Sequence, residues 1–172
     1  MRADAVRVRV LVATCALMLT SLAISIGTVV ETRWADGPGL VLGPLKLQVT
    51  YNPGVAFGVG DTLPGGVVTA GTGSLTAAII VYVLRTAPRT ALIGRVGLTL
   101  LIAGASANTV DRGIDGVVID YCHTGWWPTF NLPDIFITGG VGLAVASSFR
   151  SQQRRQHHGP DSVAETTSGT TR

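Results

Sequence analysis

Long stretches without a charged side chain constrain the possible fold of this chain more than any other feature of its sequence. Residues 10–30 and residues 63–84 are apolar and uncharged. Each stretch reaches the roughly 20 helical residues that are needed to cross the hydrocarbon core of a bilayer. Residues 91–110 contain only Arg95, which lies near one end, where its side chain can extend to the headgroups. The sequence therefore predicts three membrane-spanning helices over these ranges.

A fourth span is predicted over residues 135–149, a shorter stretch than the other three. The helix is long enough if it begins at residues 132–134, because proline is tolerated in a first turn. The composition agrees, since 47% of the 172 residues are hydrophobic, 13% are charged and the mean hydropathy is +0.43. We therefore expect an all-α integral membrane domain with four transmembrane helices over residues 1–150. The polar residues 151–172 are expected to form a disordered tail.

Basic residues predict the orientation of these helices. Arginines precede the first span, surround the turn between the second and third, and follow the fourth. Because cytoplasmic loops are enriched in Lys and Arg, we expect all three clusters, and so both termini, on the cytoplasmic side. The loops 31–62, with a candidate strand at 45–49, and 111–134 then lie outside. The charge pattern does not form the basic stripe of a nucleic-acid-binding protein.

Ionisable residues beside the apolar stretches are candidate site residues. Asp111 and Arg112 end the third span, and Asp134 opens the fourth. Charged groups at membrane depth usually face a bundle interior or a cavity, although anchoring of a helix end explains each one alone equally well. Asp120 lies in GVVIDY, whose alternation predicts a short extended stretch. Two carboxylates in a poorly solvated place share one proton and can act as acid and base, which is the chemistry of an aspartic peptidase.

The two cysteines, Cys15 and Cys122, are far apart in sequence and form no CxxC pair. The sequence therefore indicates neither a zinc site nor a disulfide framework. We expect Cys122 and His123 to occupy an exposed loop.

Three stretches of the chain resemble the lipoprotein signal peptidase family, signal peptidase II. They are YNPGVAFG at 51–58, ASANTVDRGIDGVVIDY at 105–121 and PTFNLPD at 128–134. The family carries Asn-x-Gly-x-x-Phe, Asn-x-x-Asp-Arg, Val-Val-Asp and Asn-x-Ala-Asp motifs in this order, on a four-span chain. The resemblance also implies that the candidate strand at 45–49 belongs to a small extracytoplasmic β element.

The resemblance implies that Asp120 and Asp134 are the catalytic aspartates, one activating water and the other protonating the leaving amide. It implies a multi-pass protein of a bacterial cell membrane, with its active site on the extracytoplasmic side and with no metal or cofactor. The implied partners are membrane lipid and diacylglyceryl-modified prolipoproteins, which are cleaved before the lipidated cysteine. The other polar motif positions are expected to shape the site or bind substrate: Asn52, Gly54, Asn108, Asp111, Arg112 and Asn131.

Three features depart from the family pattern. The first span lacks an Asp-x-x-x-Lys pair at its outer end, Ala107 stands where glycine is usual, and Pro133 replaces alanine. A catalytically altered or inactive relative that binds lipidated signal peptides or partner helices is therefore the alternative interpretation. A small transporter is less favoured, because the polar groups gather at one edge rather than near the middle of the membrane.

Overall fold

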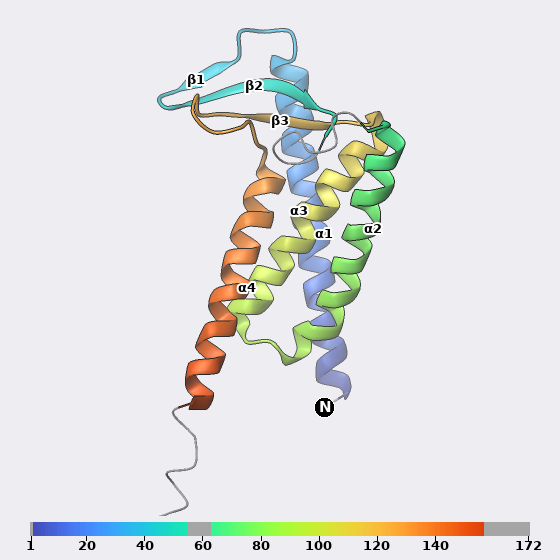
Figure 1. Cartoon of the computed structure of the whole chain (residues 1–172), viewed down its shortest axis with the longest axis vertical. Helices are drawn as coiled ribbons and strands as arrows, with labels where there is room; N and C mark the ends of the chain where they lie inside the picture. The colour runs from blue at the N-terminus through green and yellow to red at the C-terminus, as the bar shows by residue number, and fades with distance from the viewer. Residues whose placement is uncertain (1, 55–62, 157–172) are drawn as a thin grey trace, which may run out of the picture.

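The computed structural model describes residues 2–54 and 63–156, which form a helical bundle with a small sheet across one end (Figure 1). Within these residues, four helices are long and apolar enough to cross a membrane, as the sequence predicts. A 3-10 turn, Ala87–Arg89, joins the second helix to the third. The helices are α1 (Arg2–Trp34), α2 (Gly65–Thr86), α3 (Leu92–Asp115) and α4 (Leu132–Gln156).

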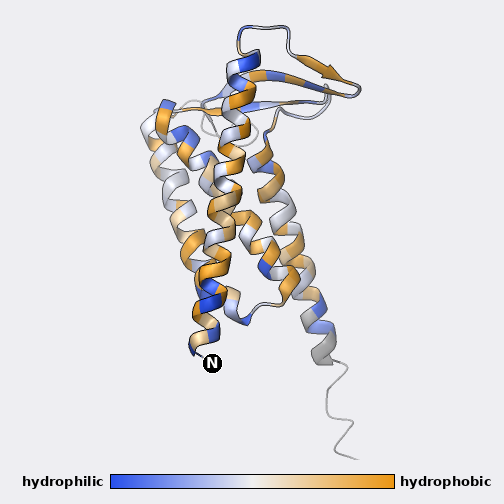
Figure 2. Cartoon of the chain, turned by 180° about the vertical axis from the view of Figure 1, so that it is seen from behind, coloured by the Kyte–Doolittle hydropathy of each residue, from blue (hydrophilic) through white to orange (hydrophobic). Residues whose placement is uncertain are grey.

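All four helices end beyond the predicted spans. Helix α1 continues to Trp34, and α4 begins at Leu132, as the fourth span requires for sufficient length. Helix α4 also continues to Gln156, so residues 151–156 of the predicted tail are helical. The rest of that tail lies outside the described residues. Hydrophobic residues predominate along the middles of the helices, whereas hydrophilic residues are found toward their ends (Figure 2).

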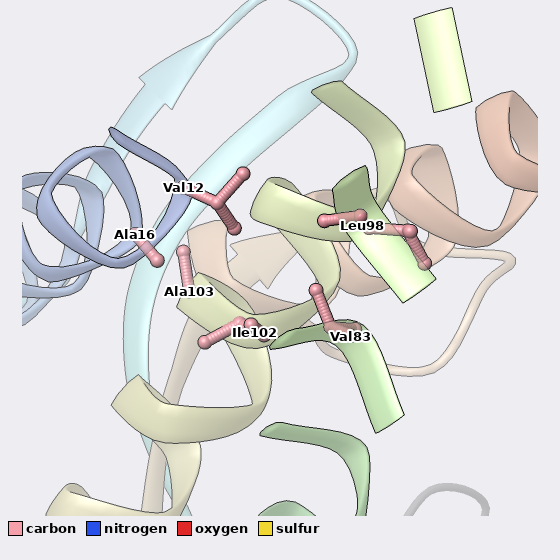
Figure 3. Close-up of a cluster of buried hydrophobic side chains, with 7 residues drawn as sticks. Val12, Ala16, Val83, Leu98, Ile102 and Ala103 are labelled. Atoms are coloured by element: carbon pink, nitrogen blue, oxygen red, sulfur yellow. The ribbon is translucent and has the colours of Figure 1, made fainter. Parts of the chain in front are cut away.

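Helix α3 is the centre of the bundle. Half of its most apolar window is buried, compared with 22% or less in the other three helices. Its small residues allow close packing, since a Cβ added at Gly97 would lie 2.6 Å from the carbonyl oxygen of Gly140 on α4. Below the sheet, Leu98 and Ile102 pack in one buried cluster with Val83 of α2 and with α1 (Figure 3).

The sheet consists of β1 (Leu40–Leu42), β2 (Leu45–Asn52) and β3 (Val118–His123), antiparallel and in that order. Both predicted extended stretches are therefore confirmed. The expectation of an exposed loop at Cys122 and His123 is wrong, because both residues lie on β3, where Cys122 is buried and His123 is half-buried. Residues far apart in sequence meet in this sheet, and Thr50 of β2 pairs with Asp120 of β3.

Candidate active site

The candidate site lies beneath the sheet, where β3 passes the end of α3 and the start of α4. Asp120 is in the middle of β3 and only 3% exposed. Asp134 is the third residue of α4, and Asn108 lies in the last turns of α3. Three elements thus each contribute one polar side chain to the same small region.

The N-terminus of α4 fixes the position of Asp134. The side-chain oxygen Oδ1 of Asn131 accepts a hydrogen bond from the Asp134 amide at 2.9 Å, and Asp134 Oδ2 accepts one from the Asn131 amide at 3.2 Å. This reciprocal pair is a capping box with an aspartate in its third position. Pro133 lies in the first turn, where a missing N–H removes no helical hydrogen bond. The departure from the family pattern at Pro133 therefore leaves the capping of α4 intact.

Asn131 joins the two carboxylates. Its side-chain nitrogen Nδ2 donates to Asp120 Oδ1 at 3.1 Å and lies equally close to Asn108 Oδ1. Asn108 in turn donates to Asp134 Oδ1 at 2.9 Å. Asn131 is only 1% exposed, so these hydrogen bonds have little competition from water. The result is a closed network that connects Asp120 to Asp134 through two amides.

Asn52 holds the other oxygen of Asp120. Its Nδ2 donates to Asp120 Oδ2 at 3.0 Å, while its Oδ1 accepts a hydrogen bond from the Gly54 amide at 3.0 Å. The second contact is ordinary turn chemistry for asparagine. The turn therefore orients the amide group so that its donor side faces the carboxylate.

Burial raises the pKa of Asp120 to about 6. The negative charge of Asp134 acts in the same direction, whereas the hydrogen bond from Asn52 and the positive charge of Arg112 oppose the shift. A carboxyl group with this pKa is present in both its protonated and its ionised form near pH 6. With a second carboxylate beside it, the pair can hold one proton between them.

Asp111 and Arg112 position the backbone around the two carboxylates. Asp111 Oδ2 accepts a hydrogen bond from the Ile119 amide at 2.8 Å, directly before Asp120 on β3. Arg112 is buried and donates through Nη2 to the Gly54 carbonyl. Its Nε is also buried and has no hydrogen-bond partner among the described residues. A cationic group with an unused donor thus lies near Asp120 and Asp134.

The structure brings together all the site residues that the sequence predicts, although Phe57 of the first motif lies outside the described residues. It also shows contacts that the sequence does not indicate. The Tyr121 hydroxyl accepts a hydrogen bond from the Leu132 amide at 3.0 Å. At the outer end of α1, Glu31 accepts one from the Tyr51 hydroxyl at 3.1 Å.

Comparison with known proteins agrees with this arrangement. The model of a family described as signal peptidase (SPase) II matches residues 11–150. The chain belongs to the signal peptidase II family. The lipoprotein signal peptidase of Brucella ovis is 37% identical over 136 residues, which are 74% of this chain and 82% of that protein.

Two further lipoprotein signal peptidases match over 109 residues each. That of Sinorhizobium fredii is 38% identical over 61% of this chain, and that of Mesorhizobium japonicum is 42% identical over 59%. The matched stretches span slightly less than two thirds of these two proteins, 65% and 62% respectively. A solved bacterial membrane enzyme superposes with a TM-score of 0.72 at 24% identity, covering 84% of this chain and 90% of that one. At this identity the likeness supports the fold alone.

Proposed function

We propose that this chain is a membrane aspartic endopeptidase that removes signal peptides from diacylglyceryl-modified prolipoproteins. Cleavage takes place before the lipidated cysteine. Membership of the signal peptidase II family supports the substrate class. The observation that carries the reaction type is the closed hydrogen-bond network joining Asp120 to Asp134 through Asn131 and Asn108.

The two carboxylates divide the proton transfers of amide hydrolysis. The ionised member removes a proton from water, which attacks the carbonyl carbon of the scissile bond. The protonated member then donates its proton to the leaving nitrogen, so that the amide bond breaks and an amine is released. The buried Nε of Arg112 is an unused donor, which hydrogen-bonds to a substrate carbonyl or to the developing oxyanion.

We further propose that both termini are cytoplasmic and that the sheet and site lie on the outer side of a bacterial cell membrane. The N-terminus and the end of α4 lie at the opposite end of the bundle from the sheet (Figure 1). Exposed arginines occur near that end, including Arg7, Arg85 and Arg89. Their excess there supports a cytoplasmic location. The exposed Trp126 and Trp127, between β3 and α4, are typical of a membrane interface.

The test is cleavage of a diacylglyceryl-modified prolipoprotein by the purified full chain in lipid. The parent is compared with Asp120→Asn, Asp134→Asn and a matched control, Asp115→Asn, whose exposed carboxylate lies at the end of α3. We expect cleavage by the parent and the control, and losses of at least about 1,000-fold in the other two variants. Cleavage by either of those variants at the parental rate would contradict the proposal. Binding without cleavage by the parent would favour a non-catalytic relative.

A further inference from the structure

Tyr121 follows Asp120 on β3, yet its side chain takes no part in the hydrogen bonds around that carboxylate. Successive residues of a strand point to opposite faces of a sheet. The Tyr121 ring belongs to a buried cluster with Val30 of α1, against which Leu132 of α4 also packs. A Cβ added at Gly27 of α1 would lie 4.0 Å from Tyr121 Cε1, so the ring lies against that helix.

The Tyr121 hydroxyl is bonded to the first turn of α4. The first amides of a helix have no partner within the helix and need acceptors from elsewhere. The Asp134 amide is bonded to Asn131, which precedes the helix directly, and Pro133 has no amide hydrogen. The Leu132 amide instead donates to Tyr121 Oη at 3.0 Å. This hydrogen bond links the sheet to the turn that carries Asp134.

The surroundings of the Tyr121 hydroxyl keep it buried and protonated. Tyr121 is 5% exposed and lines a cavity of about 20 Å³ together with Asn108 and Asp111. A cavity of this size has room for about one water molecule. Burial raises the pKa of Tyr121 to about 12, so the hydroxyl keeps its proton at every pH at which the carboxylates titrate.

We propose that Tyr121 is a positioning residue for Asp134, a role that rests on the proposed peptidase function. One short strand carries Asp120 and, one residue later, the anchor of the helix turn that presents Asp134. The separation of the two carboxylates is thereby fixed by β3 as well as by the Asn131 network. Without the hydroxyl, the first turn of α4 loses its side-chain link to Tyr121, and Asp134 is less well placed to share a proton with Asp120.

The experiment replaces Tyr121→Phe, which keeps the ring and removes only the hydroxyl. We expect kcat to fall by about 10- to 100-fold with KM changed by less than about twofold, because small displacements of a catalytic group affect the chemical step. The limb of the pH profile that reports Asp120 should also shift, which a loss of stability alone does not produce. The matched control is Tyr51→Phe on β2, which removes a hydroxyl that is bonded to Glu31. It should keep parental kcat.

Two kinetic results would overturn the proposal. One is parental kcat and an unchanged pH profile in Tyr121→Phe, and the other is an equal loss in Tyr51→Phe. If the parent cleaves no prolipoprotein, the proposed function fails. Hydrogen exchange of the Leu132 amide then still tests whether the Tyr121 hydroxyl holds the first turn of α4. Exchange should quicken by at least about tenfold in Tyr121→Phe and stay parental in Tyr51→Phe. Unchanged exchange in Tyr121→Phe would reject the role.

Discussion

Helices α3 and α4 meet in two different ways along their length. In the middle of the bundle they approach through glycines, and a Cβ added at Gly97 or Gly140 would lie 2.6 Å from a backbone oxygen of the facing helix. At the sheet end they meet through side-chain amides and a carboxylate, where Asn108 bonds to both Asn131 and Asp134. The close approach continues to Gly104, where an added Cβ would clash with the Pro133 carbonyl oxygen, and the polar contacts begin one turn later at Asn108. The same pair of helices therefore combines a tightly packed half with a polar half.

The difference separates two tasks. Close backbone packing stabilises helix association in a membrane, where no hydrophobic force drives helices together. A buried polar network is less suited to that task, because every group in it must find a partner. It can, however, hold carboxylates in the unusual protonation states that catalysis needs. Substitutions in the glycine half should thus affect folding, whereas substitutions in the polar half should affect cleavage.

The largest effect on cleavage short of replacing an aspartate is expected at Asn131. Asn131→Ala removes both the helix cap and the link to Asp120, so kcat/KM should fall by about 100- to 1,000-fold. Asn131→Ser is the informative control, because serine caps a helix well but is too short to reach Asp120. Serine should restore the thermal unfolding midpoint without restoring cleavage. Recovery of both would show that Asn131 acts only as a cap.

The glycine half is tested by Gly140→Ala, which should lower the free energy of unfolding by about 3 kcal/mol through overpacking. The matched control is Gly139→Ala, since a Cβ at this neighbouring position meets nothing within 4 Å. Thermal unfolding in detergent measures the difference between the two variants. Cleavage per folded molecule should stay parental in both. A selective loss of cleavage in Gly140→Ala would mean that the two halves are not separate.

Asp120 should make stability depend on pH. Its pKa is raised in the folded protein from an ordinary value of 3.8 to about 6, so folding favours the protonated form. This contribution is fully present below about pH 4 and is lost as the pH rises through 6. Raising the pH from 4 to 7 should therefore lower stability by an amount on the order of 2 kcal/mol. Asp120→Asn should abolish this contribution, and an unchanged pH dependence of its unfolding midpoint would contradict the assignment.

The smallest effect is expected from arginine substitutions on α3. Arg112 at the polar end and Arg95 at the other end each donate to a backbone carbonyl, of Gly54 and of Ala87 respectively. Arg112→Lys should lower kcat/KM by about tenfold, because lysine lacks the forked donor group. Arg95→Lys should leave kcat/KM unchanged. Equal effects of the two substitutions would remove the distinction between the two ends of the helix.

The sequence predicts the polar half better than the packed half. The length of the apolar stretches is sufficient to locate the four spans. The order of the motifs is sufficient to predict which residues lie around Asp120. The close approach of Gly97 to Gly140 is not predictable in this way, because small residues also occur at positions such as Gly139, where nothing lies within 4 Å of an added Cβ. Which of them faces a neighbour depends on how the helices cross.

Tyr121 shows a similar limit. In the sequence, a tyrosine after an aspartate on a strand is explained by ordinary packing. Its hydrogen bond to the Leu132 amide depends on the path of the chain between β3 and α4, which the sequence does not show. Cys122 is misassigned for the same reason, since the strand that buries it pairs with β2 from a distant part of the chain. Motifs thus predict which residues take part in the site, whereas the tertiary arrangement determines how they are held.

The most direct test of the buried carboxylate pair is the pH dependence of kcat/KM for prolipoprotein cleavage by the parent. The structure predicts a profile with one limb at an apparent pKa of about 6, where Asp120 exchanges its proton. A fall in activity below pH 6 assigns Asp120 as the base, and a fall above it assigns Asp120 as the acid. A profile that is flat from about pH 4 to 8 would contradict a coupled, buried pair as the catalytic centre.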